Sequence, residues 1–304
     1  MASTNLPKLI VIVGPTATGK SALGVKLAQE FGGEIISADS RQVYRGLDIG
    51  TGKITSEEMA GIPHHLLDIA DPQDQLSVVE WRKQADAAVA DILARGQLPI
   101  IVGGTGFYIQ AIVDNFTPPP VPPNSKLRQE LDRLSLTELT DRLAQLDPDR
   151  LANIETKNPR RLIRAIEIAE YLGSVPNLVD LTSPPQYQVL LIGLDWPAEI
   201  LKTKITKRLE ARLAAGLIDE AKRLQAEGLS LERMTELGLE YRYLVKLLAK
   251  ELTENQMVKS LTQAIWHYAK RQKTWFKKDR RIHWFRPDET KAIDHLVRKF
   301  IQSV

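Results

Sequence analysis

The residues from Gly14 to Ser21 have the types and spacing that bind phosphate groups. They read GPTATGKS, which matches G-x-x-x-x-G-K-[ST], and they follow the apolar run at 9–13. In such a loop the glycines let successive backbone N–H groups point into one concavity, while the lysine adds a mobile positive charge and the last hydroxyl binds Mg²⁺. A helix from Lys20 to about Phe31 would add the positive end of its dipole. The segment predicts a site for two linked phosphates, formed by Gly14, Pro15, Thr16, Ala17, Thr18, Gly19, Lys20 and Ser21.

A carboxylate that could act as a catalytic base follows the second strand pattern. Asp39 comes directly after the apolar run at 34–38, and an open parallel sheet binds its ligands at the carboxyl edge. There it could take a proton from a hydroxyl, as in a small-molecule kinase, or from an amine, as in an alkyl transferase. The next run, 99–102, ends in Gly103, Gly104 and Thr105, whereas switch-type ATPases end this strand in an aspartate that holds Mg²⁺. The pattern argues against a nucleotide switch.

The composition excludes several other kinds of site. The chain of 304 residues has no cysteine, which excludes disulfides, thiolate zinc sites and cysteine nucleophiles. The adjacent His64 and His65 would point to different sides of the backbone, so we do not interpret them as a metal site. No run of 18 apolar residues and no signal-like N-terminus occur, so we expect a soluble cytoplasmic protein without a membrane partner.

The charge is distributed unevenly along the chain. Residues 201–304 contain 23 Lys and Arg against 13 Asp and Glu, a net charge of +10, whereas the first 200 residues carry −7. Within the basic third, residues 264–286 interleave aromatic and cationic side chains. Such a surface suits nucleic acid, because cations neutralise phosphates and rings stack on bases. A solvated helical surface with its aromatics in the core would give the same pattern.

The secondary-structure pattern predicts an α/β fold with a helical insertion. Strand-type runs at 9–13, 34–38, 99–102 and 187–194 alternate with helical patterns, which is typical of a parallel sheet with crossover helices. One of these helices should begin at Ser77, which forms a capping box with Glu80. Proline-rich segments at 117–123 and 183–185 bracket a purely helical stretch. We therefore expect a P-loop NTPase-like parallel sheet with flanking helices at 1–116 and 187–304, a basic helical C-terminal part, and a helical insertion domain at 117–186.

The insertion contains a helix with an unusual first turn. Asn158 and Pro159 are a cap and a first helical residue, and the helix should run to Gly173 with a core stripe that includes Leu162 and Ile163. Cations at the N-terminus of a helix oppose its dipole. The placement of Arg160, Arg161 and Arg164 there suggests an external anion, although a solvated basic turn is the alternative.

Seven blocks of sequence occur together, in order, across nearly the whole chain. They are GPTATGKS at 14–21, SADSRQVYRGLDIGTGK at 37–53, PHHLLDIADP at 63–72, IVGGTGFYIQA at 101–111, NPRRLIRAIEI at 158–168, LGLEYR at 237–242 and AKRQKTWFK at 269–277. Together they resemble the tRNA dimethylallyltransferase family. The chain departs from the usual family pattern at Gly52, often alanine, at Arg212, usually apolar, and in LGLEYR, where VGYR or IGYK types are more frequent.

The resemblance implies a reaction and a set of site residues. It implies transfer of the dimethylallyl group of dimethylallyl diphosphate to N6 of the adenosine 3′ of the anticodon (position 37) in tRNA, with Mg²⁺ at Ser21 and the enzyme acting as a monomer on the anticodon stem-loop. The implied catalytic residues are Asp39 as general base, Thr105 and Arg208. The implied tRNA contacts are Asp39, Ser40, Arg41, Gln42, Thr105, Arg128, Arg160, Arg161, Leu162, Ile163, Arg164, Tyr241, Arg242, Lys270 and Arg271.

Three alternatives remain open at this point. A small-molecule kinase would use Asp39 to activate a hydroxyl, but it would not need the basic, aromatic C-terminal surface. A non-catalytic or NTP-gated RNA-binding protein would not need a carboxylate after the second strand. A transferase acting on free adenine nucleotides differs from the tRNA enzyme only in that basic surface.

Overall fold

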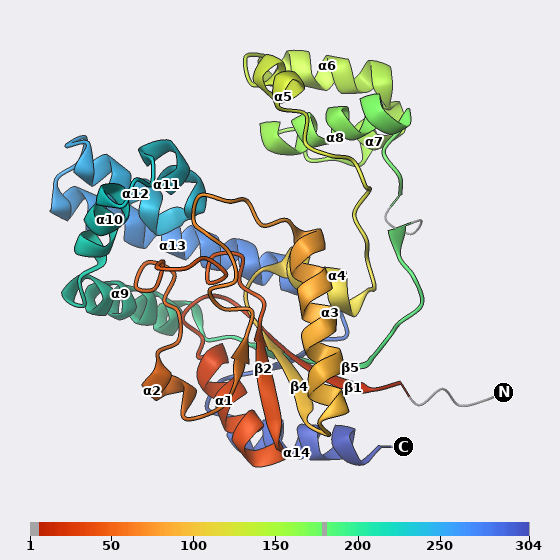
Figure 1. The fold of residues 1–304 in the computed structure, drawn as a ribbon, viewed down its shortest axis with the longest axis vertical. Coiled ribbons are helices and arrows are strands. Elements are labelled where there is room, and N and C mark those ends of the chain that lie inside the picture. Colours follow the sequence, from red (N-terminus) through yellow and green to blue (C-terminus); the bar gives the residue numbers. More distant parts are fainter. Residues whose placement is uncertain (1–5, 178–180, 304) are drawn as a thin grey trace. The chain divides into compact units, whose positions relative to one another are not determined.

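The computed structural model describes residues 6–177 and 181–303 and contains a parallel sheet with helices on both faces (Figure 1). The ends of the expected core and residues 178–180 of the expected insertion lie outside this range. The strands pair in the order β3-β2-β4-β1-β5-β6. They are β1 (Lys8–Val13), β2 (Gly33–Ser37), β3 (His64–His65), β4 (Leu98–Val102), β5 (Gln188–Leu194) and β6 (His283–Phe285). The expected α/β fold is confirmed.

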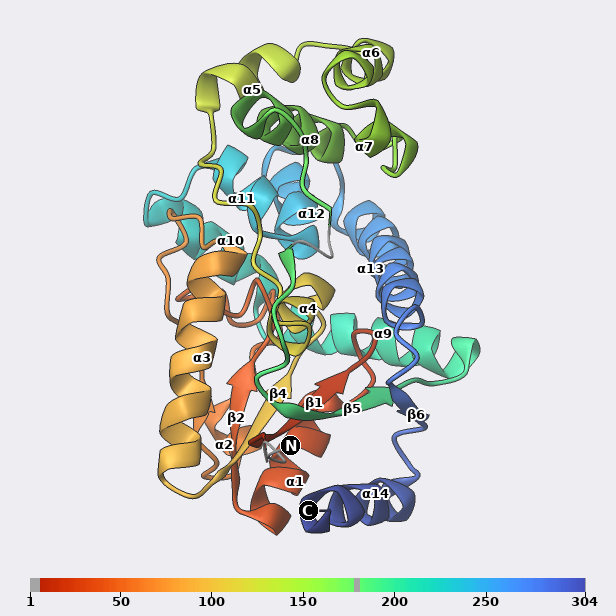
Figure 2. The same cartoon turned by 90° about the vertical axis from the view of Figure 1, so that its right-hand side faces the viewer.

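Side chains alternate between two cores on the faces of the sheet. Leu9 and Val11 of β1 belong to a core formed with α3 (Val78–Ala94), α4 (Gly106–Val113) and α13 (Glu254–Phe276). Ile10 and Ile12 belong to the opposite core, which α1 (Lys20–Phe31) and α14 (Thr290–Gln302) cover (Figure 2). Because both faces are covered, the central strands are apolar throughout rather than alternating with polar residues.

The C-terminal third adds a group of helices to this core, namely α9 (Ala198–Ala214), α10 (Leu217–Ala226), α11 (Leu231–Leu237), α12 (Leu239–Leu248) and α13. Buried side chains of α9 to α13, such as Leu209, Leu224 and Leu261, join the same core as α3. None of the helices in the described part of the chain has the length and apolar character to cross a membrane. The short helix α2 (Ser56–Met59) lies earlier in the chain, between β2 and β3.

The contacts divide the chain into two compact units, Met1–Val113 with Pro185–Val304 and Asp114–Pro184. The second unit is built from α5 (Ser125–Leu131), α6 (Leu136–Leu146), α7 (Pro148–Ala152) and α8 (Pro159–Leu172). Its own core includes Leu131, Leu143, Leu162 and Ile166. A hydrophobic core of its own gives this short segment a packed interior independent of the sheet.

Several sequence expectations match the observed elements closely. The helix after the phosphate loop ends at Phe31, with Gly32 in the left-handed conformation, and the helix after Ser77 has the expected capping box with Glu80. Asn158 caps α8, which ends at Gly173 as predicted. The two edge strands were not predicted. The strand β3 is only His64–His65 and β6 only His283–Phe285, too short and too polar to give an apolar run.

Candidate active site

The phosphate loop connects β1 to α1 and is closed by its own hydrogen bonds. The Thr18 hydroxyl, which is buried, donates to the Pro15 carbonyl at 2.9 Å, and Lys20 Nζ donates to the same oxygen at 2.8 Å. Ala17 adopts a φ of 62°, a left-handed conformation that costs free energy in a residue other than glycine and that is found at ligand-binding loops. The strand, loop and helix are thus in the arrangement that the motif requires.

Two cations at this loop lack a carboxylate partner within the described residues. One is Lys20, and the other is Arg208 of α9, whose Nη1 donates to the Thr16 hydroxyl at 3.1 Å and Nη2 to the Gly52 carbonyl at 3.3 Å. Burial of the ammonium group and the positive charge of Arg208 lower the pKa of Lys20 to about 7. Burial and the charge of Arg212 lower the pKa of Arg208 to about 10. An anion in this loop would relieve both effects.

Asp39 and Thr105 meet where the neighbouring strands β2 and β4 end. The Asp39 Oδ1 accepts a hydrogen bond from the Arg41 amide at 2.9 Å, and the described residues offer Oδ2 no donor. The Thr105 hydroxyl oxygen accepts from the Ser40 amide at 3.0 Å, and the Thr105 amide donates to the Ala38 carbonyl at 3.2 Å. One carboxylate oxygen is therefore held in place while the other can take a proton.

Gln272 of α13, which sequence reasoning did not select, joins the two halves of this site. It is buried, its Oε1 accepts from the Thr16 amide at 2.8 Å, and its Nε2 donates to the Gly104 carbonyl at 3.0 Å. A Cβ on Gly104 would overlap Nε2, so glycine is required there for close approach. The only available signal was its place in the matched block at 269–277.

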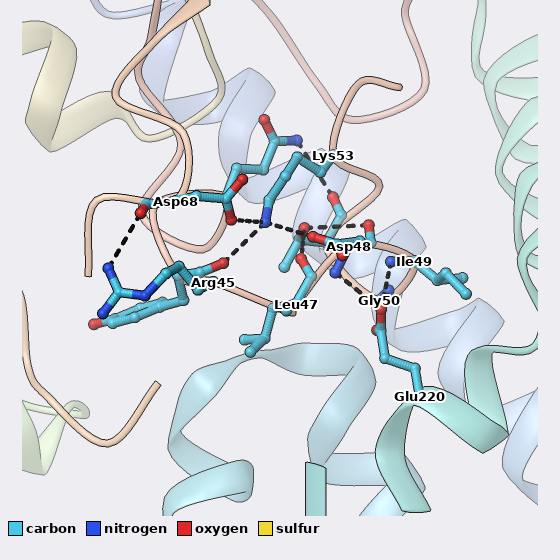
Figure 3. Close-up of polar contacts among 12 residues, drawn as sticks. Arg45, Leu47, Asp48, Ile49, Gly50, Lys53, Asp68 and Glu220 are labelled. Carbon is cyan, nitrogen blue, oxygen red and sulfur yellow. Dashed lines mark hydrogen bonds and ion pairs between the residues drawn. The ribbon is translucent and has the colours of Figure 1, made fainter. Parts of the chain in front are cut away.

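A second unpredicted network holds the loop between Arg45 and Lys53 (Figure 3). Glu220 of α10 is buried, and its carboxylate accepts from the backbone amides of Asp48, Ile49 and Gly50 at 2.8–2.9 Å. The Lys53 ammonium donates to the Tyr44 carbonyl at 2.9 Å and pairs with Asp48 and Asp68. These bonds fix a loop of irregular backbone, including the carbonyls that Arg208 and Arg212 contact.

Gly52, Arg212 and Glu240 lie together beside Arg208. Arg212 Nη1 donates to the Gly50 carbonyl at 3.3 Å and pairs with Glu240, of the LGLEYR block, at 3.1 Å. Gly52 has a φ of 60°, and a Cβ there would overlap nitrogen atoms of both arginines. Gly52 therefore leaves room for both guanidinium groups.

Comparisons with known proteins identify the family of the chain. A family model described as IPP transferase matches residues 42–279, and one described as Isopentenyl transferase matches residues 7–74. The chain belongs to the IPP transferase family. The resemblance seen in the sequence is thereby confirmed.

Relatives of the chain match over most of its length. The tRNA dimethylallyltransferase 1 of Geotalea uraniireducens (strain Rf4) is 47% identical over 265 residues, covering 87% of this chain and 86% of the relative. The crystal structure of the full-length tRNA isopentenylpyrophosphate transferase from Bacillus halodurans is 38% identical with a TM-score of 0.73, covering 97% of this chain and 95% of that chain. A eukaryotic dimethylallyltransferase acting on tRNA is 27% identical with a TM-score of 0.78, covering 95% and 76%.

Three of the residues expected to contact tRNA are buried instead. Leu162 and Ile163 of α8 lie in the core of the second unit. Tyr241 is 1% exposed, and its hydroxyl donates to Glu220 at 2.7 Å. Their side chains are unavailable to a large ligand, so in this member of the IPP transferase family we assign them to packing. A matched block contains structural as well as ligand-binding residues, and the prediction that these three contact tRNA stays a prediction.

Of the arginines of the second unit that were expected to contact tRNA, three pair with a carboxylate and one has no carboxylate partner among the described residues. Arg128 and Arg164 both pair with Glu167, whose carboxylate is buried. Burial opposes ionisation of Glu167, yet the hydrogen bonds from Arg128, the Asn124 amide and Arg164 lower its pKa. Arg161 pairs with Glu155 at 2.8 Å. Arg160 is exposed, and no described carboxylate pairs with it.

The other expected tRNA contacts lie in the first unit. Arg242, Lys270 and Arg271 are exposed, and Arg41 is half-buried. Gln42 is occupied within the protein, because its Nε2 donates to the Gly52 carbonyl at 3.1 Å.

Proposed function

We propose that this chain transfers a dimethylallyl group from dimethylallyl diphosphate to N6 of adenosine 37, just 3′ of the anticodon, in tRNA. The observation that carries the proposal is that Lys20 of the phosphate loop and Arg208 of α9, two cations without a carboxylate partner among the described residues, lie close to Asp39 at the end of the next strand. The names of the relatives and of the solved structures support the same reaction. We further propose that the enzyme is a cytoplasmic monomer, and the lack of cysteine is compatible with a reducing compartment.

The proposed reaction breaks a carbon–oxygen bond and forms a carbon–nitrogen bond. The diphosphate leaves the allylic carbon with the bonding electrons, and its developing charge is stabilised by Lys20, Arg208 and the amides of the loop. The adenine N6 attacks the same carbon and gives up a proton to Asp39 Oδ2. Proton removal matters because the N6 lone pair is delocalised into the ring and is a poor nucleophile. Thr105 holds Ser40 and the turn that carries Asp39.

The geometry fits a magnesium ion shared with the diphosphate. The Ser21 side chain is exposed at the first turn of α1, and the described residues give its hydroxyl no hydrogen-bond partner. Those residues contain no cluster of three or more acidic or histidine side chains suited to a metal. Mg²⁺ commonly takes one or two protein ligands and fills its shell with substrate phosphates and water. Bound at Ser21, the ion would neutralise charge on the leaving group.

The alternative functions are not favoured by the findings. A kinase is not favoured because the family match and the relatives are those of transferases of an isoprenoid group. Transfer to free adenine nucleotides is less well supported, because the relatives named above act on tRNA. A free nucleotide would also not need the RNA contacts that are required to extrude a base from an anticodon loop.

The role of Asp39 is testable with Asp39→Asn and Asp39→Ala. Both variants should lose at least about a hundredfold in kcat, which is the usual contribution of a general base, and both should bind the anticodon stem-loop with nearly unchanged affinity. Single-turnover transfer and equilibrium binding measure the two quantities separately. Turnover close to that of the unsubstituted enzyme in Asp39→Ala would remove this residue as the base.

A further inference from the structure

One face of α13 carries two exposed aromatic side chains beside the candidate active site. Tyr268 and Trp275 are 37% and 38% exposed, whereas Met257, Leu261 and Phe276 of the same helix are buried. Large apolar side chains on a helix normally gather on its buried face. These two are seven residues apart, so they lie on the same side of the helix about 10 Å from each other along its axis.

Gln272 fixes the orientation of this face toward the active site. It follows Tyr268 by four residues and precedes Trp275 by three, which is the spacing of neighbours on a helix surface. Since its carboxamide bonds to the Thr16 amide and the Gly104 carbonyl, the aromatic residues above and below it are directed to the same edge of the sheet.

Each ring lies next to a different part of the proposed site. The Trp275 indole lies against Gly106, where a Cβ would overlap its Nε1, and Gly106 directly follows Thr105. Tyr268 lies one turn of α13 before Gln272, whose carboxamide bonds to the Thr16 amide and the Gly104 carbonyl at this edge of the sheet. The described residues give the Tyr268 hydroxyl no hydrogen bond.

The surroundings of the rings are positively charged. The Arg271 guanidinium lies over the Tyr268 ring, 5.8 Å from its centroid, and Lys270 is exposed on the same turn. Aromatic rings flanked by cations match a single-stranded nucleic acid, because bases stack on the rings while phosphates meet the cations. An aliphatic ligand alone would gain nothing from the cations.

We propose that Tyr268 and Trp275 form a nucleobase-stacking surface, which contacts the extruded adenine and a base next to it in the RNA strand. This inference rests on the proposed function and adds the residues that hold the acceptor base in reach of Asp39. Stacking on an aromatic side chain is tolerant of base identity, so the surface would contribute affinity and position rather than sequence choice.

The experiment compares Tyr268→Leu with Tyr268→Phe, and Trp275→Leu with Trp275→Phe, on an anticodon stem-loop RNA. The leucine variants should raise the KM and the Kd for RNA about tenfold or more, because each base stacked on an aromatic contributes about 1–3 kcal/mol. The phenylalanine variants keep a ring and should stay within about threefold. The KM for dimethylallyl diphosphate should not change.

A second readout separates this inference from the proposed function. Stem-loop RNA that carries 2-aminopurine, which has no N6 amine to react, in place of the target adenine should fluoresce more strongly when bound to Tyr268→Leu than when bound to the unsubstituted enzyme, because stacking on an aromatic ring quenches it. If the unsubstituted enzyme makes no five-carbon adduct, the proposed function fails. If it does, but Tyr268→Leu leaves RNA affinity and quenching unchanged or raises only the KM for the diphosphate, the stacking surface is refuted. If Trp275→Leu disturbs the packing against Gly106, the Tyr268 variants alone test the stacking surface.

Discussion

The ammonium group of Lys20 should destabilise the unliganded protein at neutral and acidic pH. Its pKa is lowered from 10.5 to about 7, so the folded state holds this proton less tightly than the unfolded state does. Below pH 7 the full penalty of the buried charge is present. As the pH rises from 7 toward 10.5, the folded protein loses the proton first and the penalty decreases. Replacing Lys20 with methionine, which is similar in length and uncharged, should therefore stabilise the free protein at pH 6.

The size of the effect follows from the same shift. A difference of one pKa unit corresponds to about 1.4 kcal/mol, so the stability advantage of Lys20→Met should fall by about 1.4 kcal/mol per pH unit between pH 7 and 9, or by roughly 2–3 kcal/mol in all. Other titrating groups are common to both proteins and cancel in the difference. Under the proposed function this charge binds the diphosphate, so the variant should lose use of that substrate.

Urea unfolding followed by tryptophan fluorescence measures this difference. All five tryptophans lie in the unit that contains the sheet, so the signal reports that unit. Lys207→Met is the control for the same exchange of side chains away from the phosphate loop, because Lys207 is exposed on α9, the helix that carries Arg208. A pH-independent difference for Lys20→Met, or a destabilised variant at pH 6, would refute the reasoning.

Three further substitutions test the supporting contacts. Gln272→Leu leaves two backbone groups unpaired and should cost about 2–4 kcal/mol in the free energy of unfolding while lowering kcat; unchanged stability would contradict the assigned bonds. Arg160→Ala should reduce the slope of log K against log salt for tRNA binding by about 1, the change expected for one lost phosphate contact, and Arg161→Ala, which removes an arginine already paired with a carboxylate, should reduce it by less. Equal slopes for the two variants would argue against a phosphate contact of Arg160. Gly52→Ala should displace Arg208 and Arg212 and so raise the KM for dimethylallyl diphosphate about tenfold, which corresponds to a loss of about 1.4 kcal/mol in binding free energy. The control Gly61→Ala has a similar φ, 80° against 60°, with open space, so equal KM changes would attribute the effect to backbone strain.

Features set by neighbouring residues could be predicted from the sequence. The phosphate loop, the helix after it and the capping boxes depend on residues within a few positions of one another, and the carboxyl-edge position of Asp39 follows from a parallel sheet. Gln272 and Glu220 could not be found this way. Their partners lie 256 and about 170 residues away in the chain, and nothing in local spacing encodes such pairs.

The helical part of the chain shows where two kinds of inference conflict. The period of α8 placed Leu162 and Ile163 in a core stripe, whereas the matched block suggested that they contact tRNA. The structure buries both side chains, as the hydrophobic period predicted. Similarly, Tyr241 in a matched block packs against Gly50, its ring 2.6 Å from where a Cβ would lie. A resemblance transfers residue identity, and only the contacts separate binding from packing.

The central claim is that the phosphate loop binds a diphosphate that leaves an allylic carbon, and a comparison of the two possible donors tests it most directly. The enzyme is incubated with Mg²⁺, unmodified tRNA and radiolabelled dimethylallyl diphosphate, and in parallel with ATP labelled in its terminal phosphate. The account predicts stoichiometric release of diphosphate, with the carbon label on a single adenosine, and no use of ATP. Consumption of ATP as the donor, with no labelled adenosine in the RNA, would contradict it.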